Sequence, residues 1–255
     1  MTVRELYSLL NERIPPSLSC EWDNDGLMCC PDGDREVRRV LVALDVTEGV
    51  VREAIEGEYD VILSHHPFIF KGLRAIDEEN YISAKAIDLI REGISVMSFH
   101  TRLDALKGGV NDCLASILGL CHVRPLVSDD GELGRVGELA EETDLRSFAE
   151  TVRDLLEAPF VLTADAGRRV RTVAVLGGEG SDEIEAARQA GADTYVSGRL
   201  GYHNMTDAPE RGINLIEAGH YYTENPVCDR LAELVQELDE SIVCDVTESG
   251  CVQAV

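Results

Sequence analysis

The stretch Asp60-Val61-Ile62-Leu63-Ser64-His65-His66-Pro67 places two histidines directly after a short apolar run. A run of this length, bounded by polar residues, is typical of a buried strand. The stretches 94–104 and 213–224 are similar, because in each a strand-like run is followed by a histidine and, four residues later, by a carboxylate. Binding crevices of open α/β sheets lie beyond the carboxyl ends of the strands. We therefore expect these polar side chains to meet.

The rest of the chain alternates strand-like and helix-like segments, which predicts an α/β fold with largely parallel strands. In the first half we expect strands at 40–44, 60–64 and 94–99, with helices between them. A polar, glycine-containing segment at 128–134 is interpreted as a linker, after which a helix is expected at 144–157. The strands expected in the second half are 159–163, 171–176, 193–197 and 213–217.

This alternation predicts two related α/β domains, residues 1–127 and 128–255, with mixed, largely parallel sheets flanked by helices. The first domain would carry the paired histidines and the 100–104 motif, and the second the 220–224 motif. The C-terminal helix and strand are able to pack on the first domain. Clefts between domains are common binding sites, so we expect the metal site in the cleft between these two.

Composition restricts the partners. The chain has 255 residues, 48 of them acidic and 23 basic, with a formal net charge of −25. A surface this acidic repels phosphate backbones, so nucleic-acid binding is not expected. The N-terminus has no apolar leader pattern and no apolar run could cross a bilayer, so no membrane association is expected. The eight cysteines include no C-x-x-C pair, and we expect a cytoplasmic protein.

Each candidate motif also has a plainer interpretation. Adjacent strand residues point to opposite faces, so His65 and His66 reach one site only if the strand has already ended; otherwise one is a core histidine and the other an exposed one. An isolated loop aspartate such as Asp104 is commonly a turn or cap residue. His220 and Glu224 share a face if they are helical, but they also fit the turn before a helix that begins near Pro226.

Taken together, the candidates suit a metal site better than any single motif does. Imidazole and carboxylate bind several first-row ions, which include Zn, Fe, Mn, Ni and Co. Five ligands are too many for one tetrahedral zinc with an open position, but they suit two divalent ions that acidify a shared water for hydrolysis. The five candidate ligands are His65, His66, Asp104, His220 and Glu224.

Other motifs are less specific. His100 is ambiguous between ligand, orienting residue and turn residue, and it is one candidate acid/base group. His203, after the strand expected at 193–197, is the other, although capping of the next helix is an equal alternative. The glycine-rich segment 177–181 favours a tight turn over a phosphate cradle, because Glu179 would repel an anion. No G-x-S-x-G motif supports a serine hydrolase.

Several of these motifs occur in an order that resembles the NGG-one-interacting-factor-three-like family, whose members are often called GTP cyclohydrolase I type 2 homologues. They are the segments 21–27 (Glu-Trp-Asp-Asn-Asp-Gly-Leu), 64–70 (Ser-His-His-Pro-Phe-Ile-Phe), 100–104, 177–180 and 219–224. The resemblance implies a dinuclear metal centre held by the five candidate ligands, two α/β domains and a toroidal homohexamer. The segment 198–204 follows the family pattern only in part, which leaves a role for His203 open.

Two functions follow as hypotheses. The first is a metal-dependent hydrolase acting on a small-molecule substrate, with ring opening of GTP, or of another small heterocycle, as the named possibility. The alternative is a non-catalytic metal-binding hexamer that serves as a metal carrier or as a regulatory scaffold for other proteins. A carrier should release its metal reversibly, whereas a catalytic centre should retain it.

Overall fold

The computed structural model describes residues 1–129, 131–252 and 254. Two compact units are formed: one by Met1–Leu103 together with the segment that starts at Val227, the other by Asp104–Pro226. The sequence pattern predicted one domain boundary, between residues 127 and 128. In the structure, the chain passes from one unit to the other after Leu103 and again after Pro226. No helix of the described residues is both long and apolar enough for a membrane span.

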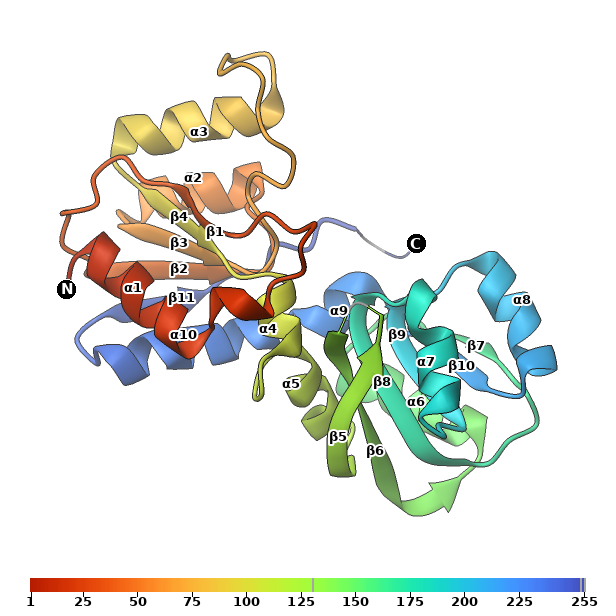
Figure 1. The fold of residues 1–255 in the computed structure, drawn as a ribbon. Coiled ribbons are helices and arrows are strands. Elements are labelled where there is room, and N and C mark those ends of the chain that lie inside the picture. Colours follow the sequence, from red (N-terminus) through yellow and green to blue (C-terminus); the bar gives the residue numbers. More distant parts are fainter. Residues whose placement is uncertain (130, 253, 255) are drawn as a thin grey trace. The chain divides into compact units, whose positions relative to one another are not determined.

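The first unit is built on a five-stranded sheet in the order β1-β4-β3-β2-β11. Its strands β2, β3, β4 and β11 run parallel, and β1 pairs antiparallel with β4. Figure 1 shows α2 and α3 on one face of this sheet and α1 and α10 on the other. The strands are β1 (Gly26–Cys29), β2 (Arg39–Ala43), β3 (Val61–Ser64), β4 (Ser95–Ser98) and β11 (Val243–Val246); the helices are α1 (Val3–Arg13), α2 (Glu48–Glu56), α3 (Tyr81–Glu92) and α10 (Val227–Leu238), with a 3-10 turn at Pro16–Leu18.

Burial on both faces explains why these strands read as continuous apolar runs. In β2, Leu41 and Ala43 pack with Val50 of α2 and Leu89 of α3, while Val42 between them is equally buried and faces the opposite side. Local signals set the helix bounds. The Thr47 side chain accepts a hydrogen bond from the first turn of α2, and Gly93 ends α3 in the left-handed conformation.

The second unit contains a six-stranded mixed sheet in the order β5-β6-β8-β9-β10-β7. Its central strands β8, β9 and β10 are parallel, and the flanking pairs are antiparallel. The strands are β5 (Cys121–Ser128), β6 (Gly131–Thr143), β7 (Leu162–Ala164), β8 (Val170–Glu179), β9 (Thr194–Arg199) and β10 (Asn214–Glu217); the helices are α5 (Val110–Ile117), α6 (Leu145–Leu155), α7 (Ile184–Gln189), α8 (Tyr202–Arg211) and α9 (His220–Glu224), with a 3-10 turn at Ser181–Glu183. Helix α4 (Thr101–Ala105) contains the position at which the two units divide.

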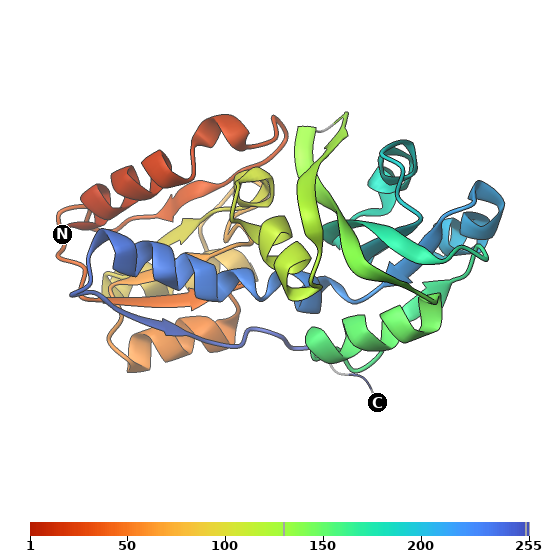
Figure 2. The ribbon, with the colours of Figure 1, turned by 90° about the horizontal axis from the view of Figure 1, so that it is seen from below.

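Two apolar layers cover this sheet. Val173 and Val175 of β8 pack toward Phe148 of α6, whereas Ala174 of the same strand packs with Ile184 of α7. Figure 2 shows α6 and α7 on opposite sides of the sheet. The alternation follows from the period of two along a strand, and it gives each face of the sheet its own core.

The expected fold class, two mixed α/β sheets flanked by helices, is confirmed. The linker expected at 128–134 is wrong, because most of that segment belongs to β5 and β6, which pair antiparallel from Cys121↔Glu138 to Ser128↔Gly131. Asp130 lies outside the described residues. Polar turn residues mark the connection of a hairpin as well as they mark a linker, so the sequence signal was ambiguous.

Candidate metal centre

His65 and His66 occupy the first two positions after β3, which ends at Ser64. The His65 side chain is buried and its Nδ1 lies 2.9 Å from the carbonyl oxygen of Phe99. A carbonyl oxygen only accepts hydrogen bonds, so Nδ1 carries the proton and the lone pair of neutral His65 is on Nε2. His66 Nδ1 lies 2.7 Å from Oδ1 of Asp45, and Asp45 follows β2 in the chain. Both imidazoles are thus oriented as metal-binding histidines commonly are.

His100, which follows β4, has the same kind of support. Its Nδ1 lies 2.8 Å from Asp23 Oδ1, and the other oxygen of that carboxylate accepts hydrogen bonds from the Thr101 hydroxyl (2.6 Å) and amide (3.1 Å). Burial raises the pKa of Asp23, but the hydrogen bonds from His100 and Thr101 outweigh it and lower the pKa to about 2. Asp23 is therefore a permanently charged group that fixes the orientation of the His100 ring.

The first unit brings these three histidines together. One ring nitrogen from each of His65, His66 and His100 lies within 4.8 Å of the others. Their ring centroids are 5.1 to 5.8 Å apart. Because all three Nδ1 atoms face an oxygen acceptor, Nε2 is the atom of each ring that can bind an ion.

The remaining three candidate ligands, Asp104, His220 and Glu224, belong to the second unit. His220 and Glu224 are the first and last residues of α9, and His220 Nε2 lies 3.0 Å from Glu224 Oε2. The two residues therefore share one face of a short helix. A carboxylate oxygen of Asp104, in α4, lies within 4.8 Å of one from Glu224, and both side chains are buried. Glu224 thus lies close to an imidazole and to a second carboxylate, and both kinds of group bind divalent first-row ions.

Two glycines of β8 leave the space that Glu224 occupies. A Cβ on Gly178 would overlap Glu224 Oε1 and approach His220 Nε2 to 3.1 Å, and one on Gly177 would approach Glu224 Cγ to 2.9 Å. Gly178 also has φ +68°, a conformation that favours glycine. The glycine-rich segment therefore serves close approach to the candidate ligands, which is neither of the interpretations that its sequence suggested.

The other predicted acid/base residue, His203, is placed differently. It lies in the exposed first turn of α8, where its ring contacts that of Tyr202 at a centroid distance of 5.6 Å. Among the described residues, none of the groups suited to a metal includes His203.

Sequence reasoning missed the two carboxylates that hold the histidines, Asp23 and Asp45. Asp23 lies within Trp-Asp-Asn-Asp-Gly, a pattern that by itself fits a turn before a strand. Its role depends on a histidine 77 residues away in the chain, and that of Asp45 on one 21 residues away. The usable signal was the position of Asp45, directly beyond the carboxyl end of a strand parallel to β3.

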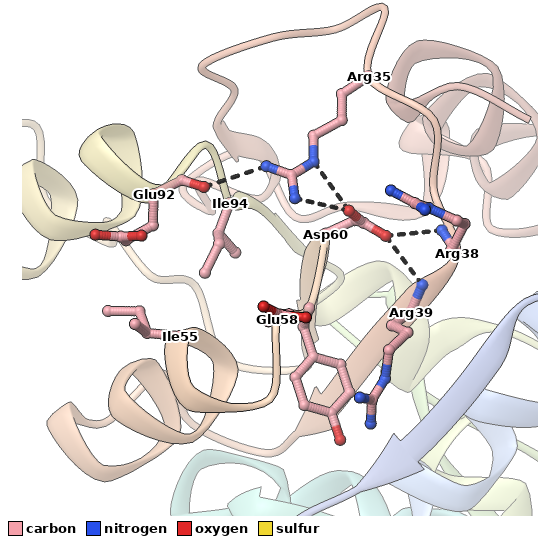
Figure 3. Close-up of a pocket in the computed structure, with 9 residues that line it drawn as sticks. Arg35, Arg38, Arg39, Ile55, Glu58, Asp60, Glu92 and Ile94 are labelled. Carbon is pink, nitrogen blue, oxygen red and sulfur yellow. Dashed lines mark hydrogen bonds and ion pairs between the residues drawn. The ribbon is translucent and has the colours of Figure 1, made fainter.

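A cavity of about 430 Å³ lies elsewhere in the first unit, lined by Arg35, Arg38, Arg39 and Asp60 among others (Figure 3). One oxygen of the Asp60 carboxylate accepts from Arg35 Nε and Nη2, and the other from the amides of Arg38 and Arg39. Asp60 and Arg39 lie at the amino ends of β3 and β2, opposite to the ends that carry the histidines. These ionic groups join strand ends to one another, so we interpret this cavity as structural.

The fold and the gathered side chains define an α/β protein with candidate metal-binding groups of histidine, aspartate and glutamate. Comparison with known families makes this specific: the chain matches the Duf34/NIF3 (NGG1p interacting factor 3) family model over residues 1–251, and it belongs to that family.

Relatives match along nearly their whole length. A Clostridium perfringens protein named GTP cyclohydrolase 1 type 2 homolog is 34% identical, with 95% of this chain and 94% of the relative covered. A Nostoc protein of the same name is 36% identical, with 94% and 93% covered. Among solved structures, a Staphylococcus aureus hypothetical protein is 29% identical, has a TM-score of 0.90 and covers 100% of this chain and 99% of its own. The family resemblance that the sequence motifs indicated is confirmed.

Proposed function

We propose that this protein is a metal-dependent hydrolase that acts on a nucleotide such as GTP or on another small heterocycle. The observation that carries the proposal is the orientation of His65 and His66, whose Nδ1 atoms are each held by an oxygen acceptor. A hydrogen-bonded second ring nitrogen is typical of histidines that bind metals. The name printed for the relatives supports GTP as the first substrate to test.

The proposed ligands are His65, His66, Asp104, His220 and Glu224. Two divalent ions, when bound, would lower the pKa of a water molecule and polarise the substrate. Asp45 and the Phe99 carbonyl hold two of the histidines in the orientation that metal binding needs. Because both second-unit carboxylates are buried, a cation would replace a desolvation cost with a favourable charge interaction.

His100 is proposed to carry a proton during the reaction. Its Nδ1–H faces the Asp23 carboxylate, which fixes the orientation of the ring and leaves Nε2 to give or take a proton. Asp23 therefore acts on the chemistry through His100 and is a positioning residue.

The test combines metal analysis with turnover. Protein purified without added metal is expected to contain about two divalent ions per chain, and GTP is expected to be converted to a ring-opened product detected by mass spectrometry. His65→Gln should lose metal and turnover together, and His100→Gln should keep the metal and lose turnover. His203→Gln tests the other predicted acid/base residue, and His122→Gln, at an exposed histidine of β5, is the matched control.

The alternative function, a metal carrier or scaffold, predicts different results for the same proteins. A carrier would exchange its ions freely with a chelator and would show no turnover above that of the His65→Gln variant on GTP or on a panel of phosphoesters and amides. The predicted homohexamer is a separate proposal, which sedimentation velocity of the purified protein tests.

A further inference from the structure

Trp22 and Phe70 are two large aromatic side chains that the fold leaves open to solvent, with 55% and 44% of their surface exposed. Trp22 is the one tryptophan of the sequence. Single exposed apolar residues are common and need no explanation. These two differ because both contact the ring of His100, which we propose to be the proton carrier.

The rings of Trp22, Phe70 and His100 all contact one another. The centroid of Trp22 lies 6.4 Å from that of Phe70 and 6.3 Å from that of His100, and the Phe70 and His100 centroids are 6.2 Å apart. The planes meet at 75°, 77° and 84°, so each ring is almost perpendicular to the other two. Such edge-to-face contacts are a favoured arrangement of aromatic pairs, and they hold the exposed rings in defined orientations.

Contacts made by residues next to Trp22 and Phe70 in the chain also fix the positions of the two rings. Asp23, next to Trp22, has a fully covered side chain that is bonded to His100 and Thr101. The Asn24 side-chain amide donates to the carbonyl oxygen of Ile69 at 2.5 Å, which ties the segment of Trp22 to that of Phe70. The exposed pair is therefore fixed before any ligand arrives, a condition that favours binding because little conformational entropy remains to be lost.

The geometry points to a subsite in which Trp22 and Phe70 bind the planar heteroaromatic ring of a ligand whose reacting end reaches His100. A planar ring can stack on one aromatic face and meet the other ring at its edge. Base stacking on aromatic side chains does not depend on charge. This matters in a chain with a net charge of −25, because long-range attraction would not help an anionic ligand to bind. That the ring belongs to the substrate rests on the proposed function; the binding of the ring does not.

The experiment uses Trp22 as its own reporter, since all tryptophan emission of the protein comes from this residue. Metal-loaded full-length protein is titrated with guanosine and, in parallel, with ribose 5-phosphate, with excitation at the red edge of indole absorption. We expect guanosine to quench the emission saturably and ribose 5-phosphate to leave it unchanged. Equal responses to the two probes, or no response to guanosine, would overturn the subsite.

Variants separate stacking from general damage. Phe70→Leu keeps the reporter and should weaken guanosine binding at least about fivefold, the smallest loss typical of a removed stacking partner. Phe160→Leu, at another exposed phenylalanine that lies in the second unit, should leave the affinity unchanged. Emission that shifts on dilution of the protein but not with guanosine would show that a second copy covers Trp22, and it would overturn the proposal.

The readout also distinguishes this inference from the proposed function. Guanosine binding without turnover of any nucleotide would support the subsite and refute the proposed hydrolase activity. Turnover of GTP with an unchanged KM in Phe70→Leu would support the proposed hydrolase activity and refute the subsite.

Discussion

Replacing Asp23 with asparagine should cost stability in a way that depends on pH. The wild-type carboxylate accepts four hydrogen bonds, from His100 Nδ1, from the hydroxyl and amide of Thr101 and from the amide of Asn24, and its side chain is not exposed. Asparagine has the same shape but no charge. Its amide nitrogen also donates, so it would face at least one of these donors with a donor of its own.

The magnitude follows from the pKa of Asp23, which is lowered from an ordinary value of 3.8 to about 2. A shift of this size corresponds to ~2.4 kcal/mol of folding stability at neutral pH. Because the pKa is lowered in the folded state, the contribution is complete above the pKa of the unfolded chain and is lost as the pH falls through the folded-state value. Linkage predicts that ~1.3 kcal/mol of it remains at pH 3.

The assay is urea unfolding of both metal-free proteins at pH 7 and pH 3, followed by circular dichroism. The difference in unfolding free energy between wild type and Asp23→Asn should shrink by ~1.1 kcal/mol between the two pH values. Comparison of the two proteins at each pH cancels the titration of groups they share. A difference that stays constant from pH 7 to pH 3 would refute the assignment of Asp23 as a charged anchor.

Three further substitutions test other parts of the site and fold. Gly178→Ala should lower both metal content and stability. Gly167→Ala, at a similar φ of +70° with open space around it, should show only the backbone strain of about 1–2 kcal/mol. Equal metal contents in these two variants would contradict the close-approach role of Gly178. Asp45→Asn should weaken metal binding about 10- to 100-fold, as loss of a histidine-orienting carboxylate typically does, measured by competition with a chelator. Asp60→Asn should destabilise the fold by about 3–5 kcal/mol in urea unfolding and leave the number of bound ions unchanged; a lost ion would contradict its structural role.

The sequence predicted most of the parallel strands because their residues alternate between two buried faces. The run at 60–64 corresponds to β3 and the run at 171–176 lies within β8, since strands of a covered parallel sheet need apolar side chains on both sides. The antiparallel pair β5 and β6 was not predicted. β5 is an edge strand whose side chains are mostly exposed, so its sequence carries little of the apolar pattern that marks the central strands.

The candidate ligands were accessible to sequence reasoning because each lies in a short segment that follows a recognisable strand. His65 comes directly after β3, and His220 begins α9 after β10. Gly178 was not accessible in the same way. A glycine that admits a distant glutamate looks the same in sequence as a glycine that forms a turn, and only the position of Glu224 distinguishes the two roles.

The carboxylates show the limit of sequence reasoning most clearly. Among 48 acidic residues, composition cannot separate Asp23 and Asp60 from those that only keep the surface charged. The structure separates them by burial and donors: each has a covered or nearly covered side chain with at least three hydrogen bonds to it. Desolvating a carboxylate is costly unless several donors compensate, so a buried, fully bonded carboxylate must hold something in place. For Asp23 that is a histidine of the candidate metal centre, and for Asp60 it is the meeting point of two strands.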